Sequence, residues 1–205
     1  MIKGTPELIA QRREEIVNAC ERLYQTMSFR DITLKEIGSV TSFSRPTIYN
    51  YFQTKEEIFL ALFEREYDRW NAELGQILRE SALTAAELAD RVAASLQRRE
   101  QLLKLLAMNN YDMEAMSRPE LLVSFKRAYG ESLAVMRAIL EKFCPNLDAQ
   151  AVLYVFFPFL FGVYPYAAVT PKQREAMRAA DVDFVEHSIH EIVRNCLIRL
   201  LDDPK

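Results

Sequence analysis

The sequence predicts an all-α protein with a small N-terminal helical head and a larger C-terminal helical bundle. Apolar side chains recur every three or four residues through most of the chain, which is the spacing of one face of an α-helix. Glycine is scarce, with five in 205 residues, and several segments open with a hydroxyl residue of the kind that caps helices. No segment shows the strict alternation of apolar and polar residues that marks a half-buried strand.

The first eighty residues predict four helices, of which the middle two are short. The first begins near Pro6, a residue that suits the first helical turn. Hydroxyl side chains mark the starts of the other three, at Thr33, Ser44 and Thr54. Thr33 and Thr54 are each followed three residues later by glutamate, which is the capping-box pattern. The expected domains are residues 1–53, a three-helix head, and residues 54–205, which open with a connecting helix over about 54–80.

Helical signals continue to the end of the chain. Thr84 and Glu87 form a further capping box, which opens a helix that runs to about residue 108. An irregular or helical piece follows. Three more helices are expected over about 118–143, from 148 to about 169 and over about 170–180, and a final amphipathic helix from Asp181 onward.

Residues 149–171 carry no formal charge and are long enough to span a bilayer, which takes about 20 residues. Pro158, Gly162 and Pro165 interrupt the segment, and no cluster of Lys or Arg flanks it. A helix buried in a bundle or dimer core has the same composition. We therefore expect a buried helix without membrane contact, with a membrane-associated helical protein as the alternative.

Charge and composition favour a cytoplasmic protein that is not an enzyme. The chain has a net charge of −3, but residues 1–55 hold eight basic and six acidic side chains, so this part carries +2. Three distant cysteines and two histidines supply no metal site, and no cofactor is expected. A signal peptide, a phosphate-binding glycine loop and a nucleophile motif are also missing from the sequence.

Residues 33–58 predict a helix-turn-helix, because two short capped helices are joined by a turn of three to four residues. Ile48 and Phe52 would form the buried face of the second helix. The outer face would present four side chains: Arg45, Thr47, Tyr49 and Asn50. Arginine pairs with guanine, asparagine with adenine, and a threonine methyl group contacts thymine, so this mixture suits the major groove. Tyr49, Tyr51, Lys55 and the first N–H groups after Thr33 could hold phosphates.

This region resembles the TetR family of bacterial transcriptional regulators. The resemblance rests on Thr33, Ile37, the run Ser44-Arg45-Pro46-Thr47-Ile48-Tyr49-Asn50-Tyr51-Phe52, and Lys55-Glu56-Glu57-Ile58, about a quarter of the chain. It implies that ten residues face DNA: Thr33, Lys35, Ser44, Arg45, Pro46, Thr47, Tyr49, Asn50, Tyr51 and Lys55. One departure is Ser42, at a turn position often held by glycine, where a left-handed backbone would cost serine about 1 kcal/mol.

The resemblance also implies that the C-terminal helices form an effector pocket and a dimer interface. Aromatic and polar side chains suggest a pocket for a small apolar or aromatic effector, although aromatic residues at helical spacing also suit a plain core. The candidate lining is Met108, Asn109, Tyr111, Phe125, Tyr129, Phe156 and Phe159. Candidate dimer residues are Val152, Phe161, Ile189, Val193, Cys196 and Leu200.

The expected function is a ligand-responsive repressor that binds a palindromic operator in double-stranded DNA as a homodimer. Ligand binding would tilt the connecting helix and change the spacing of the two heads. The alternative is a constitutive DNA binder of the same fold that takes no effector.

Overall fold

A computed structural model describes residues 5–108 and 110–202, and the described residues form helices and connecting segments without strands, so the all-α prediction is confirmed. The helices are α1 (Pro6–Thr26), α2 (Leu34–Ser39), α3 (Arg45–Ile48), α4 (Lys55–Arg79), α5 (Ala85–Arg98), α6 (Glu100–Leu106), α7 (Asn110–Ala115), α8 (Pro119–Phe143), α9 (Ala149–Ala167), α10 (Pro171–Ala179) and α11 (Ile189–Leu201).

Most helices begin at the residues that the sequence suggests. The Thr33 side chain accepts hydrogen bonds from the N–H groups of Lys35 and Glu36. Complete capping boxes open α5 at Thr84 and α10 at Thr170, where these two helices were expected to begin. These local bonds fix the helix starts independently of tertiary packing.

Three local predictions are wrong. Ser44 makes no cap hydrogen bond to the backbone, and its Oγ lies 3.3 Å from the Thr47 Oγ1 instead. The helix expected over residues 84–108 breaks at Arg99 into α5 and α6. The final helix begins at Ile189 rather than near Asp181, because the capping box at Ser188 opens it.

The chain divides into two compact units, which we call the head unit (residues 1–65 and 109–127) and the body unit (residues 66–108 and 128–205). α4 and α8 each contribute residues to both units, because the division falls inside these helices. The predicted boundary between residues 53 and 54 stays a prediction.

The head unit is built around α1 and the first turns of α4. Tyr24 of α1 meets Phe59 of α4 edge to face, with ring centroids 5.1 Å apart. Arg65 of α4 donates hydrogen bonds to three side chains of α1: Glu14 (2.7 Å), Asn18 (2.6 Å) and Glu21 (2.7 Å). Aromatic packing and a shared arginine therefore hold α1 against α4.

The core of the body unit contains satisfied polar groups among aromatic side chains. The Trp70 indole N–H donates to the Ser95 hydroxyl at 3.0 Å, and the Ser132 hydroxyl donates to Asn71 at 2.6 Å. Trp70 and Phe157 pack with ring centroids 5.9 Å apart. Because buried polar groups that find partners cost little, these bonds favour one packing arrangement of the helices.

α9 is long and apolar enough to cross a membrane by length and composition alone. One face is buried in the body unit, through Val152, Leu153, Phe156, Phe157, Leu160 and Val163. The opposite face carries exposed apolar side chains, namely Tyr154, Val155, Phe161 and Tyr166. Within one chain, α9 is therefore buried on one side only.

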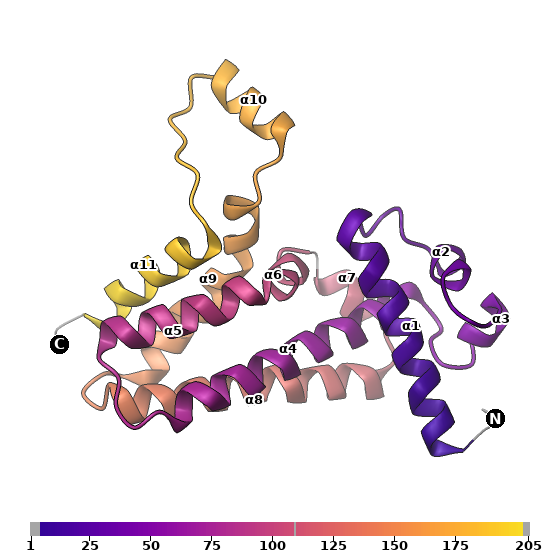
Figure 1. Cartoon of the computed structure of the whole chain (residues 1–205). Helices are drawn as coiled ribbons and strands as arrows, with labels where there is room; N and C mark the ends of the chain where they lie inside the picture. Colours follow the sequence, from indigo (N-terminus) through magenta and orange to yellow (C-terminus); the bar gives the residue numbers. More distant parts are fainter. Residues whose placement is uncertain (1–4, 109, 203–205) are drawn as a thin grey trace. The chain divides into compact units, whose positions relative to one another are not determined.

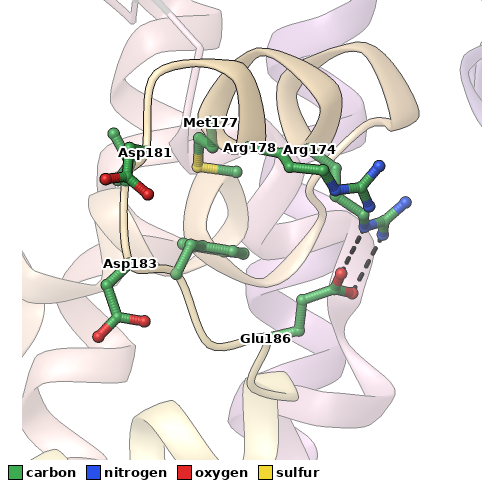
Figure 2. Close-up of a pocket in the computed structure, with 8 residues that line it drawn as sticks. Arg174, Met177, Arg178, Asp181, Asp183 and Glu186 are labelled. Carbon is green, nitrogen blue, oxygen red and sulfur yellow. Dashed lines mark hydrogen bonds and ion pairs between the residues drawn. The ribbon is translucent and has the colours of Figure 1, made fainter.

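Residues 168–188, which we call the excursion segment, leave the bundle between α9 and α11. Figure 1 shows α10 held away from these two helices on two irregular stretches, and none of the residues of α10 is buried. The two sides of the segment are joined by an ion pair, in which the Arg174 Nη2 donates to the Glu186 Oε2 at 3.0 Å (Figure 2). Val185, which lies in the stretch where the final helix was expected, is exposed here.

Candidate nucleic-acid interface

The turn between α2 and α3 is anchored by a glutamate of α1. The Glu15 carboxylate accepts hydrogen bonds from the Ser42 backbone N–H (2.5 Å) and from the Ser42 hydroxyl (3.0 Å). The Thr41 hydroxyl donates to carbonyl groups on either side of the turn. Among the described non-glycine residues only Asp181 has a positive φ, so the strain predicted at Ser42 is absent. The turn therefore needs no glycine.

α3 has one fully buried face and one exposed face. Ile48 and Phe52 are both 0% exposed, so the predicted inner face is confirmed. The opposite side presents exposed Ser44, Arg45, Pro46, Tyr49 and Asn50, with Thr47 half-buried. The backbone of α3 ends at Ile48, and turn hydrogen bonds continue as far as Phe52.

Arg45 and Tyr49 form a pair on the exposed face. The Arg45 Nη2 donates a hydrogen bond of 3.0 Å to the Tyr49 hydroxyl, and the guanidinium carbon lies 5.7 Å from the centre of the ring. The arginine side chain is thus held along the helix by its neighbour four residues on. A donor that is already oriented loses less conformational freedom when it binds.

The expected outward orientation of Tyr51 is wrong. Its side chain is only 4% exposed, and its hydroxyl accepts a hydrogen bond of 3.4 Å from the Arg12 Nη1 of α1. The tyrosine therefore joins α1 to the end of the recognition segment, which we define as residues 45–52.

Two of the expected phosphate contacts, the first N–H groups after Thr33 and the Lys55 ammonium group, already have partners within the chain. The first N–H groups of α2 donate to the Thr33 side chain. The Lys55 Nζ donates to the carbonyl oxygens of Phe29 (2.8 Å) and Ile32 (3.2 Å) and lies 4.1 Å above the Phe29 ring. Lys35, by contrast, is exposed on α2. Lys55 thus stabilises the segment between α1 and α2. Lys35 is therefore better placed than Lys55 to contact a phosphate group.

Sequence patterns did not indicate the role of Arg118. Its guanidinium donates to the Glu57 carboxylate at 2.7 Å from Nε and 2.9 Å from Nη2, and to the Tyr51 carbonyl oxygen at 3.0 Å. Glu57 was expected to close a capping box with Thr54, and only half of that box forms, through the Glu57 N–H. No periodic signal links positions 61 residues apart.

The candidate effector residues are distributed over both units. Tyr111 is 88% exposed, and Phe125 is buried in the head unit against Phe63, so neither matches its predicted place in a pocket wall. Asn109 lies outside the described residues, while Met108 and Tyr129 are half-buried in the body unit. Phe156 is fully buried between Phe157 and Phe159 and belongs to the core.

Phe159 lines an apolar cavity of about 300 Å³ in the body unit. The other lining residues come from the end of α9, the return of the excursion segment and α11: Gly162, Val163, Tyr166, Phe184, Val185, His187 and Ile192. A larger, more polar cavity of about 670 Å³ lies within the excursion segment, where Arg174, Arg178, Asp181 and Asp183 line it (Figure 2).

For three of the candidate dimer residues, the assignment to a dimer interface is wrong. Ile189 and Val193 are buried within the chain itself, because the apolar stripe of α11 packs on α5 and α9, and Val152 lies on the buried face of α9. Cys196 and Leu200 are half-buried, and Phe161 is 43% exposed. Of the predicted dimer residues, Phe161 therefore lies on an exposed apolar face, that of α9, which a second subunit could cover.

Histidine and acidic side chains do not gather into a metal-binding group anywhere in the described part of the chain. His190 instead pairs with Asp90, with 3.0 Å between the Nε2 and Oδ1 atoms, and so joins α11 to α5.

Two family models match the chain. One, described as bacterial regulatory proteins of the tetR family, matches residues 16–62, and the other, described as tetracyclin repressor-like C-terminal domain, matches residues 64–202. The first match ends and the second begins within the first turns of α4.

A curated relative and several solved structures are similar to the chain. The uncharacterized HTH-type transcriptional regulator YdgC of Bacillus subtilis is 27% identical over 87 residues, which are 42% of this chain and 45% of that protein, so the match spans less than half of its length. The fatty acid degradation regulator FadR from Bacillus halodurans superimposes with a TM-score of 0.60 at 17% identity, covering 98% of this chain and 97% of that one.

FadR from Bacillus subtilis, solved in complex with stearoyl-CoA, gives a TM-score of 0.59 at 18% identity over 92% of this chain and 96% of that chain. At such identities the two solved structures support the fold. Because the C-terminal family model alone covers more than half of the residues and the N-terminal model covers the helix-turn-helix, the chain belongs to the TetR family of bacterial regulatory proteins.

Proposed function

We propose that the protein is a cytoplasmic transcriptional repressor that binds a palindromic DNA operator as a homodimer and releases it when a small apolar or aromatic ligand binds. The observation that carries this proposal is the division of the recognition segment, residues 45–52, into two faces. Ile48 and Phe52 are fully buried, while Arg45, Tyr49 and Asn50 are exposed on the other side. A short helix with such a polar outer edge suits the major groove.

The chemistry of the exposed edge accounts for sequence recognition. Arg45 can donate two hydrogen bonds to guanine, and Asn50 can both donate to and accept from adenine. Ser44 and Lys35 are also exposed and suit contacts with phosphate oxygens, which fix the register of the protein on the duplex. Each well-formed contact with a base contributes about 1–3 kcal/mol of discrimination.

Dimerisation is supported by the exposed apolar face of α9. Tyr154, Val155, Phe161 and Tyr166 would be covered by the same face of a second copy, as a two-fold interface requires. A dimer presents two recognition segments to half-sites about 34 Å apart, which is one turn of DNA.

A ligand response is supported by the apolar cavity around Phe159. Its volume of about 300 Å³ suits a small apolar or aromatic molecule. Binding of a long-chain acyl thioester by the Bacillus subtilis relative is in line with an apolar ligand for this family member too. A coupling of about 1–3 kcal/mol between ligand and DNA would change operator affinity by roughly 5- to 150-fold.

The proposal is tested by selecting bound sequences from a random pool of duplex DNA. The wild-type protein should enrich a palindromic sequence, while Arg45→Ala and Asn50→Ala should each relax the preference at one position of each half-site. Arg91→Ala, which removes an exposed arginine from α5, is the matched control and should leave the selected sequence unchanged. If the wild-type protein enriches no sequence at low salt, the proposed function is wrong.

A further inference from the structure

The Glu57 carboxylate is one of the most completely enclosed charges in the described head unit. The residue is 1% exposed, and its two oxygen atoms accept four hydrogen bonds. The donors are the Gln53 N–H (2.7 Å), the Arg118 N–H (3.2 Å), the Arg118 Nε (2.7 Å) and the Arg118 Nη2 (2.9 Å). Three of these four bonds thus come from a single residue.

Burial would raise the pKa of Glu57, but the hydrogen bonds from Arg118 and from the two backbone N–H groups outweigh it, so the pKa lies below its usual value. The pKa of Arg118 is correspondingly raised by its hydrogen bonds to Glu57. Both groups are therefore charged at neutral pH. A buried carboxylate of this kind depends on its partner, because its charge would otherwise be uncompensated.

The same arginine also holds the end of the recognition segment. Its Nη2 donates to the Tyr51 carbonyl oxygen at 3.0 Å, and the Thr54 hydroxyl donates to the nearby Met116 carbonyl oxygen at 3.3 Å. Residues 116–118 are thus bonded to main-chain or side-chain atoms on both sides of Phe52. The last turn of the recognition segment is fixed in place by a segment that lies outside the helix-turn-helix sequence.

Arg118 immediately precedes α8, which is a single helix from Pro119 to Phe143. The first part of α8 belongs to the head unit and the remainder, from residue 128, to the body unit. The arginine therefore joins the recognition segment to the first turn of a helix that the two units share.

We propose that Arg118 is a positioning residue for DNA recognition, which sets the orientation of the recognition segment by bridging Glu57 and the Tyr51 carbonyl group. The inference rests on the proposed function, because it concerns how the DNA-reading face is aimed. Without the bridge, Arg45 and Asn50 keep their places on the recognition segment, but the end of that segment is free to shift against α4.

The test compares the spacing of half-sites that each protein selects. Wild-type protein and the variants Arg118→Met, Arg118→Lys and Glu57→Gln are presented with operators in which the distance between the selected half-sites is varied. Lys126→Met is the matched control, because it removes a cation from α8 that pairs with the half-buried Glu114 instead of Glu57. Circular dichroism first establishes which variants fold.

The wild-type protein and Lys126→Met should select one narrow spacing. Arg118→Met should accept a broader range of half-site spacings. It should bind the best operator about tenfold more weakly, which corresponds to about 1.4 kcal/mol. A loss of stability alone lowers the folded fraction equally at every spacing, so the width of the distribution reports positioning. Arg118→Lys keeps the charge but not the fork of donors, so it should broaden the distribution as well, and it replaces the methionine variant if that one does not fold.

An unchanged spacing preference in folded Arg118→Lys and Glu57→Gln would overturn this inference while leaving the proposed function intact. A wild-type protein that selects no sequence would overturn the proposed function and this inference together.

Discussion

Replacing Lys55 with methionine is expected to destabilise the head unit while leaving the salt dependence of DNA binding unchanged. The Lys55 ammonium group donates to the carbonyl oxygens of Phe29 and Ile32 and lies over the Phe29 ring. Methionine keeps most of the apolar stem over that ring but loses both donated bonds. The two carbonyl oxygens then have to find other partners.

The magnitude follows from those two bonds. A hydrogen bond that involves a charged group contributes about 1.5–3 kcal/mol, and the lower end applies here because Lys55 is only half-buried. The free energy of unfolding should therefore fall by about 3 kcal/mol. For a chain of this length each 1 kcal/mol lowers the melting temperature by roughly 2–4 °C, so a decrease of about 6–12 °C is expected.

The assay pairs thermal unfolding with DNA titrations at several salt concentrations, made well below the melting temperature. Lys35→Ala is the control, because Lys35 is exposed and suits a phosphate contact. It should leave the melting temperature nearly unchanged and reduce the slope of log K against log salt by about 0.9 per phosphate contact. If Lys55→Met melts like the wild type and shows this smaller slope instead, Lys55 contacts phosphate and the structural role argued here is wrong.

Three further outcomes are expected. Ile48→Ala should lower the free energy of unfolding by about 2–5 kcal/mol in urea titrations, because it leaves a cavity behind the recognition segment, and a wild-type midpoint would contradict that packing. The lowered pKa of Glu57 stabilises the folded state at pH values above the ordinary carboxyl pKa of about 4.3, and this contribution is lost as the pH falls through the lower folded pKa. Glu57→Gln should thus reduce the loss of stability at acid pH. If the free energy of unfolding falls equally steeply with acid in the variant and the wild type, the lowered pKa of Glu57 is refuted. Phe161→Glu should convert dimers to monomers in sedimentation experiments, and a dimer that survives it would exclude the exposed face of α9.

Local signals in the sequence were sufficient for most of the helix starts and for the two faces of α3. Thr33, Thr84 and Thr170 cap their helices through bonds to residues two or three positions away, so the pattern and the structure coincide. Ile48 and Phe52 are four residues apart and are buried together for the same reason. Such contacts are encoded within one turn of helix.

The residues whose roles were predicted wrongly are those whose contacts are made with positions far away in the sequence. Tyr51 and Lys55 have side chains that suit phosphate, but Arg12 and the carbonyl groups of Phe29 and Ile32 engage them instead. The apolar stripe of α11 looks the same whether it faces a second subunit or its own chain, and packing on α5 and α9 decided the outcome. A spacing pattern indicates which side chains are buried but does not identify their partners.

The bond between Glu57 and Arg118 has a consequence for how the head is made during synthesis. These residues are 61 positions apart, so the N-terminal helices leave the ribosome well before the arginine that completes their last contact has been added to the chain. Closing so large a loop is slow compared with forming the local helices. The nascent recognition segment therefore matures late, and a chimera that exchanges only the first sixty residues between two such regulators would separate it from the arginine with which it is finally assembled.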